Sequence, residues 1–502
     1  MALLRSVATV GSYTLVSRVF GFIRDILTAA ILGAGPVADA FFVAQRLPNL
    51  FRSLFAEGAF NAAFVPLASG TLAEGGKPAL RTFAEEAFAV LFTVLLIFVL
   101  LGEIFMPWLM TIMAPGFSAE PGKFDLVVML TRITFPYLLF ISLTALQGGL
   151  LNTVDRFAAP AATPILLNLF LIAGLLLMAH FHWQDGEVLA WALSAAGLAQ
   201  FLWLLASCAR AGVALRLRLP RLTPRVKQTL RIMGPGVLGA GVTQLNLVIS
   251  TALASLLPGG SVSYLYYADR LNQLPLGVVG IAVATAILPP LSRQVRTGDL
   301  AGAVTTQNRG VELAFLLTLP AAAAFIVLAQ PIMTVLFQRG AFGPVEAAAT
   351  AAALSAYAAG LPAFVLVKVL APGFFARHDT ATPVKVAIAA MVTNLVLTVA
   401  LMQFWAHVGI AIALSAAGWL QAITLRIAVA ALGMAAIVLA LRLMLASALA
   451  GPLMVRLGAL SALVVAGFVV FGALILALGV TDWRELRGQL MRSPPRSPGQ
   501  PA

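Results

Sequence analysis

Charged residues are scarce in this chain. Only 10% of its 502 residues are charged, whereas 61% are hydrophobic. A soluble protein of this length could not hide so much apolar surface in its core. Apolar runs long enough to cross a bilayer recur from end to end, so the sequence predicts an all-α polytopic membrane protein. A transmembrane β-barrel would instead show short segments of alternating hydrophobicity.

Other residue types are missing where an enzyme would need them. The single cysteine, Cys208, excludes an internal disulfide and a cysteine metal cage. None of the four histidines stands near paired acidic residues, and His180 with His182 would supply only two metal ligands. No Walker motif is present, so we expect no direct use of ATP. We therefore predict a protein that is not an enzyme, with no catalytic residues, no metal and no cofactor.

The apolar segments set out a membrane topology. About fourteen can be read, with centres near residues 20, 50, 98, 138, 171, 199, 243, 281, 323, 362, 395, 416, 438 and 467. The first is too long for a cleavable signal peptide. Most Lys and Arg residues fall in loops on one side, most densely between residues 209 and 231. The positive-inside rule places that side and both termini in the cytoplasm, which explains the net charge of +13 without nucleic acid as a partner.

An internal repeat divides the chain. At one constant offset, Ala44-Gln45-Arg46-Leu47 faces Ala268-Asp269-Arg270-Leu271, and Gly116 faces Gly340. Each unit holds an even number of helices, so the repeat is parallel, as in some secondary transporters. We predict an N-lobe at 1–212 and a C-lobe at 213–425, each of six helices and related by a pseudo-twofold axis. Two additional helices follow at 426–482, and a disordered cytoplasmic tail at 483–502.

Several charged residues lie inside the apolar spans. A charge at the centre of a membrane helix costs about 2.5–3.5 kcal/mol on the insertion scale, so such residues need an explanation. They are Arg18, Arg24, Asp25, Arg46, Arg52, Glu57, Arg132, Asp269, Arg270 and Lys368.

Structural ion pairing is one explanation. Arg18 and Asp25 are seven residues apart, which places them about 20° apart around a helix, and Asp39 and Arg46 repeat this spacing. Pairing of this kind is a reasonable reading for Arg46 and Arg132 individually.

Two observations favour a binding site instead. Cations outnumber anions, and Arg24 and Arg52 have no obvious partner on their own helices. In addition, positions 18, 24 and 25 correspond in the second half to Val242, Val248 and Ile249. The fold therefore does not need charge there, and arginine suits phosphate oxygens. We predict a water-filled cationic cavity in mid-membrane for an anionic, phosphorylated substrate.

Four prolines fall inside predicted spans: Pro48, Pro136, Pro275 and Pro362. Proline removes a backbone hydrogen bond and kinks a helix. These kinks can be ordinary irregularities of membrane helices, or bends that open one face of the cavity while the other closes.

Long motifs give the chain a family resemblance. They are "SRVFGFIRD", "DAFFVAQRLPNLFRSLFAEGAFNAAFVP", "YYADRLNQLPLGVVGIA", "LFQRGAF" and "KVLAPGFFARHDTATPVK". From about residue 3 to 425 the chain resembles the MurJ (MviN) family of lipid II flippases, part of the exporter superfamily that includes MATE transporters. The resemblance implies movement of the undecaprenyl-diphosphate-linked peptidoglycan precursor from the inner to the outer leaflet of the bacterial cytoplasmic membrane. It also implies two lobes around a cationic cavity, with a lipid-facing groove formed by the last two helices.

The resemblance also assigns site residues. Arg18, Arg24, Arg52 and Arg270 match the family's cavity arginines, and the last three are expected to hold the diphosphate. The other matches are Asp39, Asn49, Glu57 and Asp269, with Asp25, Arg46 and Lys368 as supporting cavity charges. One feature departs from the family pattern. The polar loop that the family carries between helices 12 and 13 is missing from "GWLQAITLRIAVAALGM", on which the helix count and the groove depend.

Alternative functions are weighed by the sign of the cavity charge. A MATE-type exporter of cationic drugs would be repelled by an arginine-rich cavity, whereas a flippase for another polyprenyl-diphosphate glycan would not. A non-transporting scaffold is opposed only by the intact arginine set. Transport coupled to membrane potential or to a monovalent cation is expected, and Thr393 and Asn394 are polar candidates for a cation site. Expected partners are lipid II or a related glycolipid, bilayer lipids and other cell-wall synthesis proteins.

Overall fold

The chain is all-helical in the computed structural model. It describes residues 2–55, 59–183, 185–376, 379 and 381–422, together with Met444, Val465 and Val469. The chain divides into two compact units, residues 1–416 and residues 417–502. Almost all described residues belong to the first unit, so the predicted helices centred at 438 and 467, the tail and the 12–13 loop lie largely outside the described residues.

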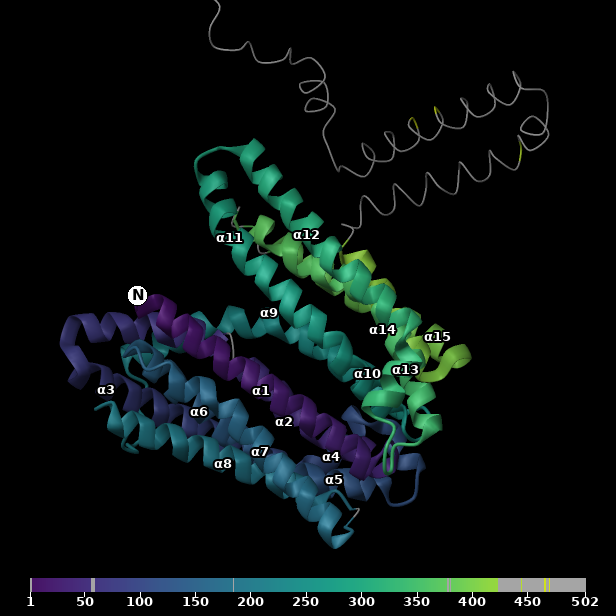
Figure 1. The fold of residues 1–502 in the computed structure, drawn as a ribbon. Coiled ribbons are helices and arrows are strands. Elements are labelled where there is room, and N and C mark those ends of the chain that lie inside the picture. Colours follow the sequence, from purple (N-terminus) through teal and green to yellow (C-terminus); the bar gives the residue numbers. More distant parts are fainter. Residues whose placement is uncertain are drawn as a thin grey trace, which may run out of the picture. The chain divides into compact units, whose positions relative to one another are not determined.

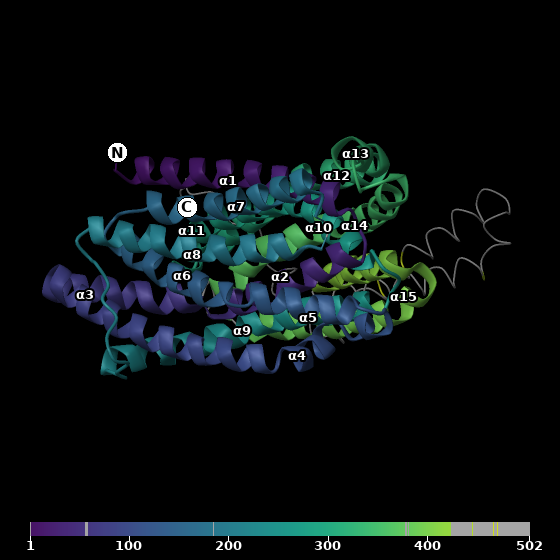
Figure 2. The same ribbon diagram turned by 90° about the horizontal axis from the view of Figure 1, so that it is seen from below.

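The first group of helices runs from α1 to α8. Their bounds are α1 Ala2–Leu32, α2 Pro36–Phe55, α3 Ala59–Ile104, α4 Met106–Met113, η1 Pro115–Ala119, α5 Lys123–Thr134, α6 Tyr137–Thr153, α7 Ala158–Phe181 and α8 Glu187–Arg210. Helix α3 is broken at Gly76, which has a φ of 66°. Figure 2 shows α1 lying beside α7, and these two helices are in contact.

The second group follows an extended linker at 211–223. Its bounds are α9 Pro224–Ser255, α10 Ser261–Pro275, η2 Leu276–Gly280, α11 Ile281–Arg296, α12 Leu300–Val327, α13 Ala329–Leu336, α14 Pro344–Phe375 and α15 Ala381–Ala422. Helix α15 turns sharply at Trp405 and Ala406, so it is two helices in sequence, as predicted from the segments centred at 395 and 416. Figure 1 shows α11 and α12 (teal) as a pair, and both contact α14.

The helix bounds reproduce the internal repeat. Helix α3 ends at Ile104 and α12 ends at Val327, close to the constant offset found in the sequence. The short helix α4 corresponds in the same way to α13, and α7 corresponds to the first part of α15, up to its break at Trp405. The prediction of an all-α membrane protein built from a parallel repeat is confirmed.

Eight described helical segments are long and apolar enough to cross a membrane. Helices α1 and α2, which carry several of the charges discussed above, are not among them. Alternating helix directions bring the turns at 154–157, 211–223 and 297–299, together with Ala376 and Asp379, to one end of the first unit, here called the basic end. The turns at 33–35, 114–122, 256–260 and 337–343, together with residues 182, 183, 185 and 186, lie at the opposite end.

The four prolines occupy distinct positions. Pro48 and Pro362 lie inside continuous helices. Pro136 separates α5 from α6, and Pro275 is followed by the π-helical segment η2. A proline lacks the N–H for a helical hydrogen bond, which accounts for a break or a change of pitch next to it.

Candidate functional site

The paired charges of α1 form the centre of the candidate site. Arg24 donates through Nε and Nη2 to Asp25 Oδ1, at 3.1 and 2.7 Å. Its Nη1 donates to Asn168 Oδ1 in α7 at 3.0 Å, and Asn168 Nδ2 donates to the Ser17 carbonyl at 3.0 Å. The expectation that Arg24 lacks a partner on its own helix was therefore wrong. The long Arg24 side chain folds back towards Asp25, and the hydrogen bond to Asn168 holds its guanidinium group against α7.

Asp25 also connects α1 with α10. Its second oxygen lies 3.8 Å from Arg270 Nε. Arg270 donates to the Tyr266 hydroxyl at 2.8 Å, and its guanidinium carbon lies 4.6 Å from the centre of the Tyr266 ring. The Arg270 side chain remains 42% exposed, so it keeps donors available for another anion. The ion pair considered between Arg18 and Asp25 is not formed, because Asp25 is already shared by Arg24 and Arg270.

Helix α2 adds a further cation. Arg46 donates through Nη1 to Thr251 in α9 at 2.6 Å and does not pair with Asp39. It interacts electrostatically with Asp269 and Arg270 of α10. The structure thus brings together five of the sequence-predicted residues from α1, α2 and α10, namely Arg24, Asp25, Arg46, Asp269 and Arg270.

Asn49 and Arg52 continue the polar face of α2 towards the basic end. Arg52 Nε donates to Asn49 Oδ1 at 3.2 Å, and Asn49 Nδ2 donates to the Gln45 carbonyl at 2.9 Å. Arg52 thus also has a partner on its own helix, contrary to the expectation. Glu57, which was predicted to follow them, lies outside the described residues.

Two further cations approach the π-helical segment η2. A Cβ added at Gly277 would lie 2.9 Å from Arg18 Nη2, and one added at Gly280 would lie 2.9 Å from Lys368 Cδ. Glycine at both positions lets the cationic side chains lie close to the backbone, and a larger residue would displace the ends of these flexible side chains. Within the described chain, Arg18 and Lys368 form no side-chain hydrogen bond or ion pair, and both are exposed.

Asp39 lies elsewhere. It is buried at the opposite end, where Oδ2 accepts from the Gly260 backbone N–H at 2.7 Å and from Lys123 Nζ at 3.2 Å. Its Oδ1 accepts from the backbone N–H and the hydroxyl of Ser263, at 2.9 and 2.6 Å. Ser263 and Arg270 are seven residues apart on α10, or about 10 Å along its axis. Asp39 therefore caps the N-terminus of α10 rather than joining the arginines.

Aromatic side chains and close backbone contacts add to the contact of Asp39 with α10. Together they join the two halves at this end of the unit and are here called the closure. The Phe42 and Tyr266 rings stack with centres 3.8 Å apart, and Tyr267 packs edge-on against Phe342. The Ala341 N–H donates to the Ala30 carbonyl at 2.8 Å. A Cβ added at Gly340, whose φ is +58°, would overlap that same carbonyl. The motif "LFQRGAF" thus serves to join α1 to the α13–α14 turn.

Sequence reasoning missed several of these partners. Lys123, at the start of α5, is buried between Asp39 and Glu120 and lies 4.3 Å from the centre of the Phe117 ring. Asn168 was visible as a polar residue in the middle of the apolar helix α7, and that signal could have identified it. Nothing in the sequence connects Thr251 with Arg46, because they stand far apart in the chain.

Comparisons with known proteins identify a matching family, a relative in sequence and relatives in structure. The family model described as "Lipid II flippase MurJ" matches residues 28–478. A probable lipid II flippase MurJ of Rhizobium meliloti is 48% identical over 85% of this chain and 80% of its own length. The solved structure of a lipid II flippase MurJ in an inward closed conformation covers 95% of this chain and 99% of its own, with a TM-score of 0.71 and 24% identity. An inward-facing multidrug resistance MATE family transporter covers 83% of this chain and 95% of its own, with a TM-score of 0.67 and 14% identity.

These matches agree with the motifs, the repeat and the membrane helices described above. They place the protein among transporters of the fold shared with MATE proteins, rather than among enzymes. The chain belongs to the MurJ family of lipid II flippases.

Proposed function

We propose that this chain carries lipid II from the inner to the outer leaflet of the bacterial cytoplasmic membrane, with its basic end in the cytoplasm. The supporting observation is the excess of cations around α1, α2, α10 and η2. Among the described residues of this group, the carboxylates of Asp25 and Asp269 are outnumbered by the cations Arg18, Arg24, Arg46, Arg270 and Lys368. Such an excess inside a membrane protein is favourable when an anionic guest neutralises it.

The arginines have different roles in binding the diphosphate. Arg24 is held by Asp25 and Asn168, so it is a fixed donor with little freedom to move. Arg18 and Arg270 are exposed, and their planar guanidinium groups can each bind phosphate oxygens in pairs. The sugar and peptide follow the phosphates between the two halves, while the polyprenyl tail stays in lipid.

Substrate binding can be coupled to movement through Asp25. The 3.8 Å contact between Asp25 and Arg270 is a weak link between α1 and α10. A diphosphate that binds Arg24 and Arg270 together replaces this weak link by charge-assisted hydrogen bonds. The two halves are then drawn together on the cytoplasmic side, which favours opening at the end that Asp39 now closes. Transport by alternating access follows.

The net positive site also connects the cycle to membrane potential. Moving one elementary charge through 100 mV changes the free energy by about 2.3 kcal/mol. An inside-negative potential would therefore pull the empty cationic carrier back to its inward-facing state. Collapse of the potential with substrate supply held constant should slow transport, and an unchanged rate would rule out this coupling.

The decisive experiment uses cells in which the native lipid II flippase can be switched off. Lipid II on the outer leaflet is measured after expression of the wild type, Arg18→Ala or Arg270→Ala at matched membrane levels. These exposed arginines are preferred to Arg24, whose removal would leave Asp25 and Asn168 without their partner. We expect wild type to restore exposure of lipid II and each variant to reduce it at least about tenfold, since charged hydrogen bonds contribute about 1.5–3 kcal/mol.

Arg132→Ala is the matched control. It also removes an arginine from a predicted membrane span, but Arg132 lies on α5 and is exposed there, outside the group formed by α1, α2 and α10. We expect it to retain transport. If the wild type is well inserted and fails, the substrate is another polyprenyl-diphosphate glycan. If all three variants behave alike, the charges are structural and the cationic site is wrong.

A further inference from the structure

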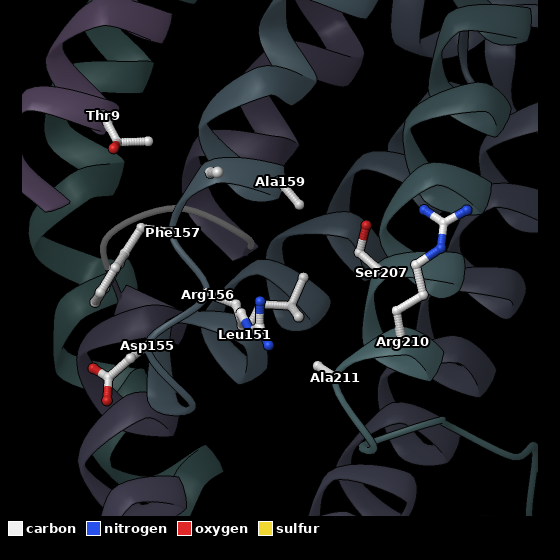
Figure 3. Close-up of a pocket in the computed structure, with 10 residues that line it drawn as sticks. Thr9, Leu151, Asp155, Arg156, Phe157, Ala159, Ser207, Arg210 and Ala211 are labelled. Carbon is white, nitrogen blue, oxygen red and sulfur yellow. The ribbon is translucent and has the colours of Figure 1, made fainter. Parts of the chain in front are cut away.

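A second cationic pocket lies at the basic end, outside the site described above. Its volume is about 390 Å³. It is formed by the first part of α1, the α6–α7 turn, the start of α7 and the end of α8 (Figure 3). Its lining residues are Thr9, Leu151, Asp155, Arg156, Phe157, Ala158, Ala159, Ser207, Arg210 and Ala211. None of these residues belongs to α2, α10 or η2, which carry most of the diphosphate site.

The pocket carries uncompensated positive charge. Arg156 is in the α6–α7 turn, and Arg210 is in the last turn of α8. Both side chains are exposed, and neither forms an ion pair or side-chain hydrogen bond with another residue that the structure describes. The lining holds one carboxylate, that of Asp155, against these two cations, and in Figure 3 it lies on the far side of Arg156 from Ser207 and Arg210.

Two further donors belong to the pocket, a hydroxyl on α8 and the N-terminus of α7. The Ser207 hydroxyl lies one turn before Arg210 on α8 and donates to the Trp203 carbonyl, and a hydroxyl can rotate to donate to an incoming anion instead. Helix α7 begins at Ala158 without a side chain capping its N-terminus, so its first N–H groups add to the positive potential. These features suit a tetrahedral oxyanion.

The surface next to the pocket is apolar and faces lipid. Leu202 and Trp203 of α8 are 50% and 41% exposed, and they precede Arg210 by about two turns. Trp203 Nε1 donates to the carbonyl of Ala159, a residue of the pocket, at 3.2 Å. A tryptophan with its ring towards lipid and its N–H towards a polar group marks the membrane–water interface. A phosphate in the pocket is therefore at the right depth to carry acyl chains along α8.

We propose that this pocket binds the phosphodiester headgroup of an anionic phospholipid from the leaflet at the basic end. Basic pockets between membrane helices on the cytoplasmic side bind headgroups of this kind in other membrane proteins. Because Thr9 of α1 lines the pocket together with α7 and α8, the bound lipid holds the basic end of α1 against these helices. This inference needs only that the basic end lies at a membrane surface, and it does not depend on the transported substrate.

The test measures lipid retention on the purified full chain. Native mass spectrometry counts phosphatidylglycerol molecules retained by the wild type, by the double variant Arg156→Gln/Arg210→Gln, and by the control Arg293→Gln/Arg296→Gln. The control removes two exposed arginines from α11 at the same end. We expect the first pair to weaken binding of the most tightly held lipid at least about tenfold, since it removes two charge-assisted contacts, and the control to leave it unchanged.

Three outcomes would overturn the proposal. Equal loss in both double variants would mean a general attraction of lipid to the basic surface. Displacement of the lipid by millimolar inorganic phosphate would mean a site for soluble phosphate. Equal retention of zwitterionic phosphatidylcholine would mean that the pocket does not distinguish lipids by the charge of their headgroup. Thermal unfolding of each variant in lipid-free detergent shows whether the chain is still folded, and an Arg156→Lys/Arg210→Lys variant that keeps partial retention separates lost charge from lost structure.

Discussion

The two ends of the first unit are held together in different ways. At the opposite end, the contact between the halves is buried and depends on few groups, with Asp39 at its centre and Phe42 stacked on Tyr266. At the basic end, the halves are joined by the extended linker at 211–223, which is attached to α3 through carboxylates. The first contact is formed only by non-covalent interactions, whereas the second includes the covalent connection between α8 and α9.

The linker attachment is built around Glu85. This carboxylate is fully buried, and it pairs with Arg81 at 2.9 Å and with Arg218 at 2.6 Å. It also accepts from the backbone N–H of Arg216 at 3.2 Å. The cations that meet it are partly exposed, with side chains 33% and 49% accessible. One buried anion thus fixes a segment whose outer face remains in water.

The closure at the opposite end combines the aromatic contacts with the polar groups around Asp39. An apolar seal would lose its hydrophobic stabilisation whenever it opened. The groups around Asp39 are hydrogen-bonded when closed and can be hydrated when open, so the free-energy difference between the two states stays small. A transport cycle that must open and close this end needs such a contact.

The largest effect is expected from Asp39→Asn. The change removes the negative charge that Lys123 faces and presents an amide N–H₂ to backbone donors. Breaking a buried charged pair typically costs about 3–5 kcal/mol, all of it from the closed state. We expect a cysteine placed at the buried Ser261 in a Cys208→Ser background to react faster with a water-soluble maleimide. An unchanged labelling rate would contradict the role of Asp39 as the closure.

Asp125→Asn is the matched control for that substitution. It makes the same chemical change at the same end of the unit, but Asp125 is exposed in the first turn of α5. We expect the labelling of the Ser261→Cys reporter to stay at its wild-type rate.

A smaller effect is expected from Gly340→Ala. Both Gly340 and Gly298 have positive φ, at +58° and +76°, so alanine at either costs about 1–2 kcal/mol in backbone strain. Only at Gly340 would the new Cβ also overlap the Ala30 carbonyl, whereas Gly298 at the basic end has open space around it. We expect Gly340→Ala to increase labelling of the Ser261→Cys reporter and Gly298→Ala to leave it unchanged. An equal increase in labelling for both variants would show that backbone strain, and not the overlap with the Ala30 carbonyl, causes the effect.

Sequence reasoning recovered the fold because its signals are local or periodic. The apolar runs correspond to helices of the structure. The constant offset between the two halves appears again in helix bounds such as those of α4 and α13. The same reasoning brought Arg24 and Arg270 into one group. Asp39 was assigned to that group through the family resemblance, and depth along a helix is not visible in a motif.

What it could not supply were contacts between distant segments. The backbone N–H groups that Asp39 binds belong to residues more than two hundred positions away, and the one that Glu85 binds more than one hundred. Such contacts follow from helix packing and leave no spacing in the chain. Lys123 illustrates the limit, because a lysine beside a turn usually remains in water, and only the carboxylates around it make burial favourable.

At the basic end, Glu85→Gln should destabilise the chain moderately. The substitution leaves Arg81 and Arg218 without a carboxylate, but these side chains can turn to water because they are partly exposed. We expect a loss of about 2 kcal/mol, below the range for a fully buried pair. The thermal unfolding midpoint in detergent should fall, while the labelling of the Ser261→Cys reporter should not rise. Increased labelling would show that the two ends are not independent.

The smallest effect is expected from Glu74→Gln, in the same linker region. Glu74 pairs with Arg225 at 2.7 Å, a shorter distance than Arg81 to Glu85, but the two side chains are 69% and 45% exposed. Water and salt screen such a pair, so it contributes about 0–1 kcal/mol despite its geometry. Arg225 also keeps its hydrogen bond to Thr71. We expect an unfolding midpoint within error of wild type, next to a clear fall for Glu85→Gln. If both variants fell equally, burial of the carboxylate would not be what fixes the linker, and the attachment would depend on the number of ion pairs instead.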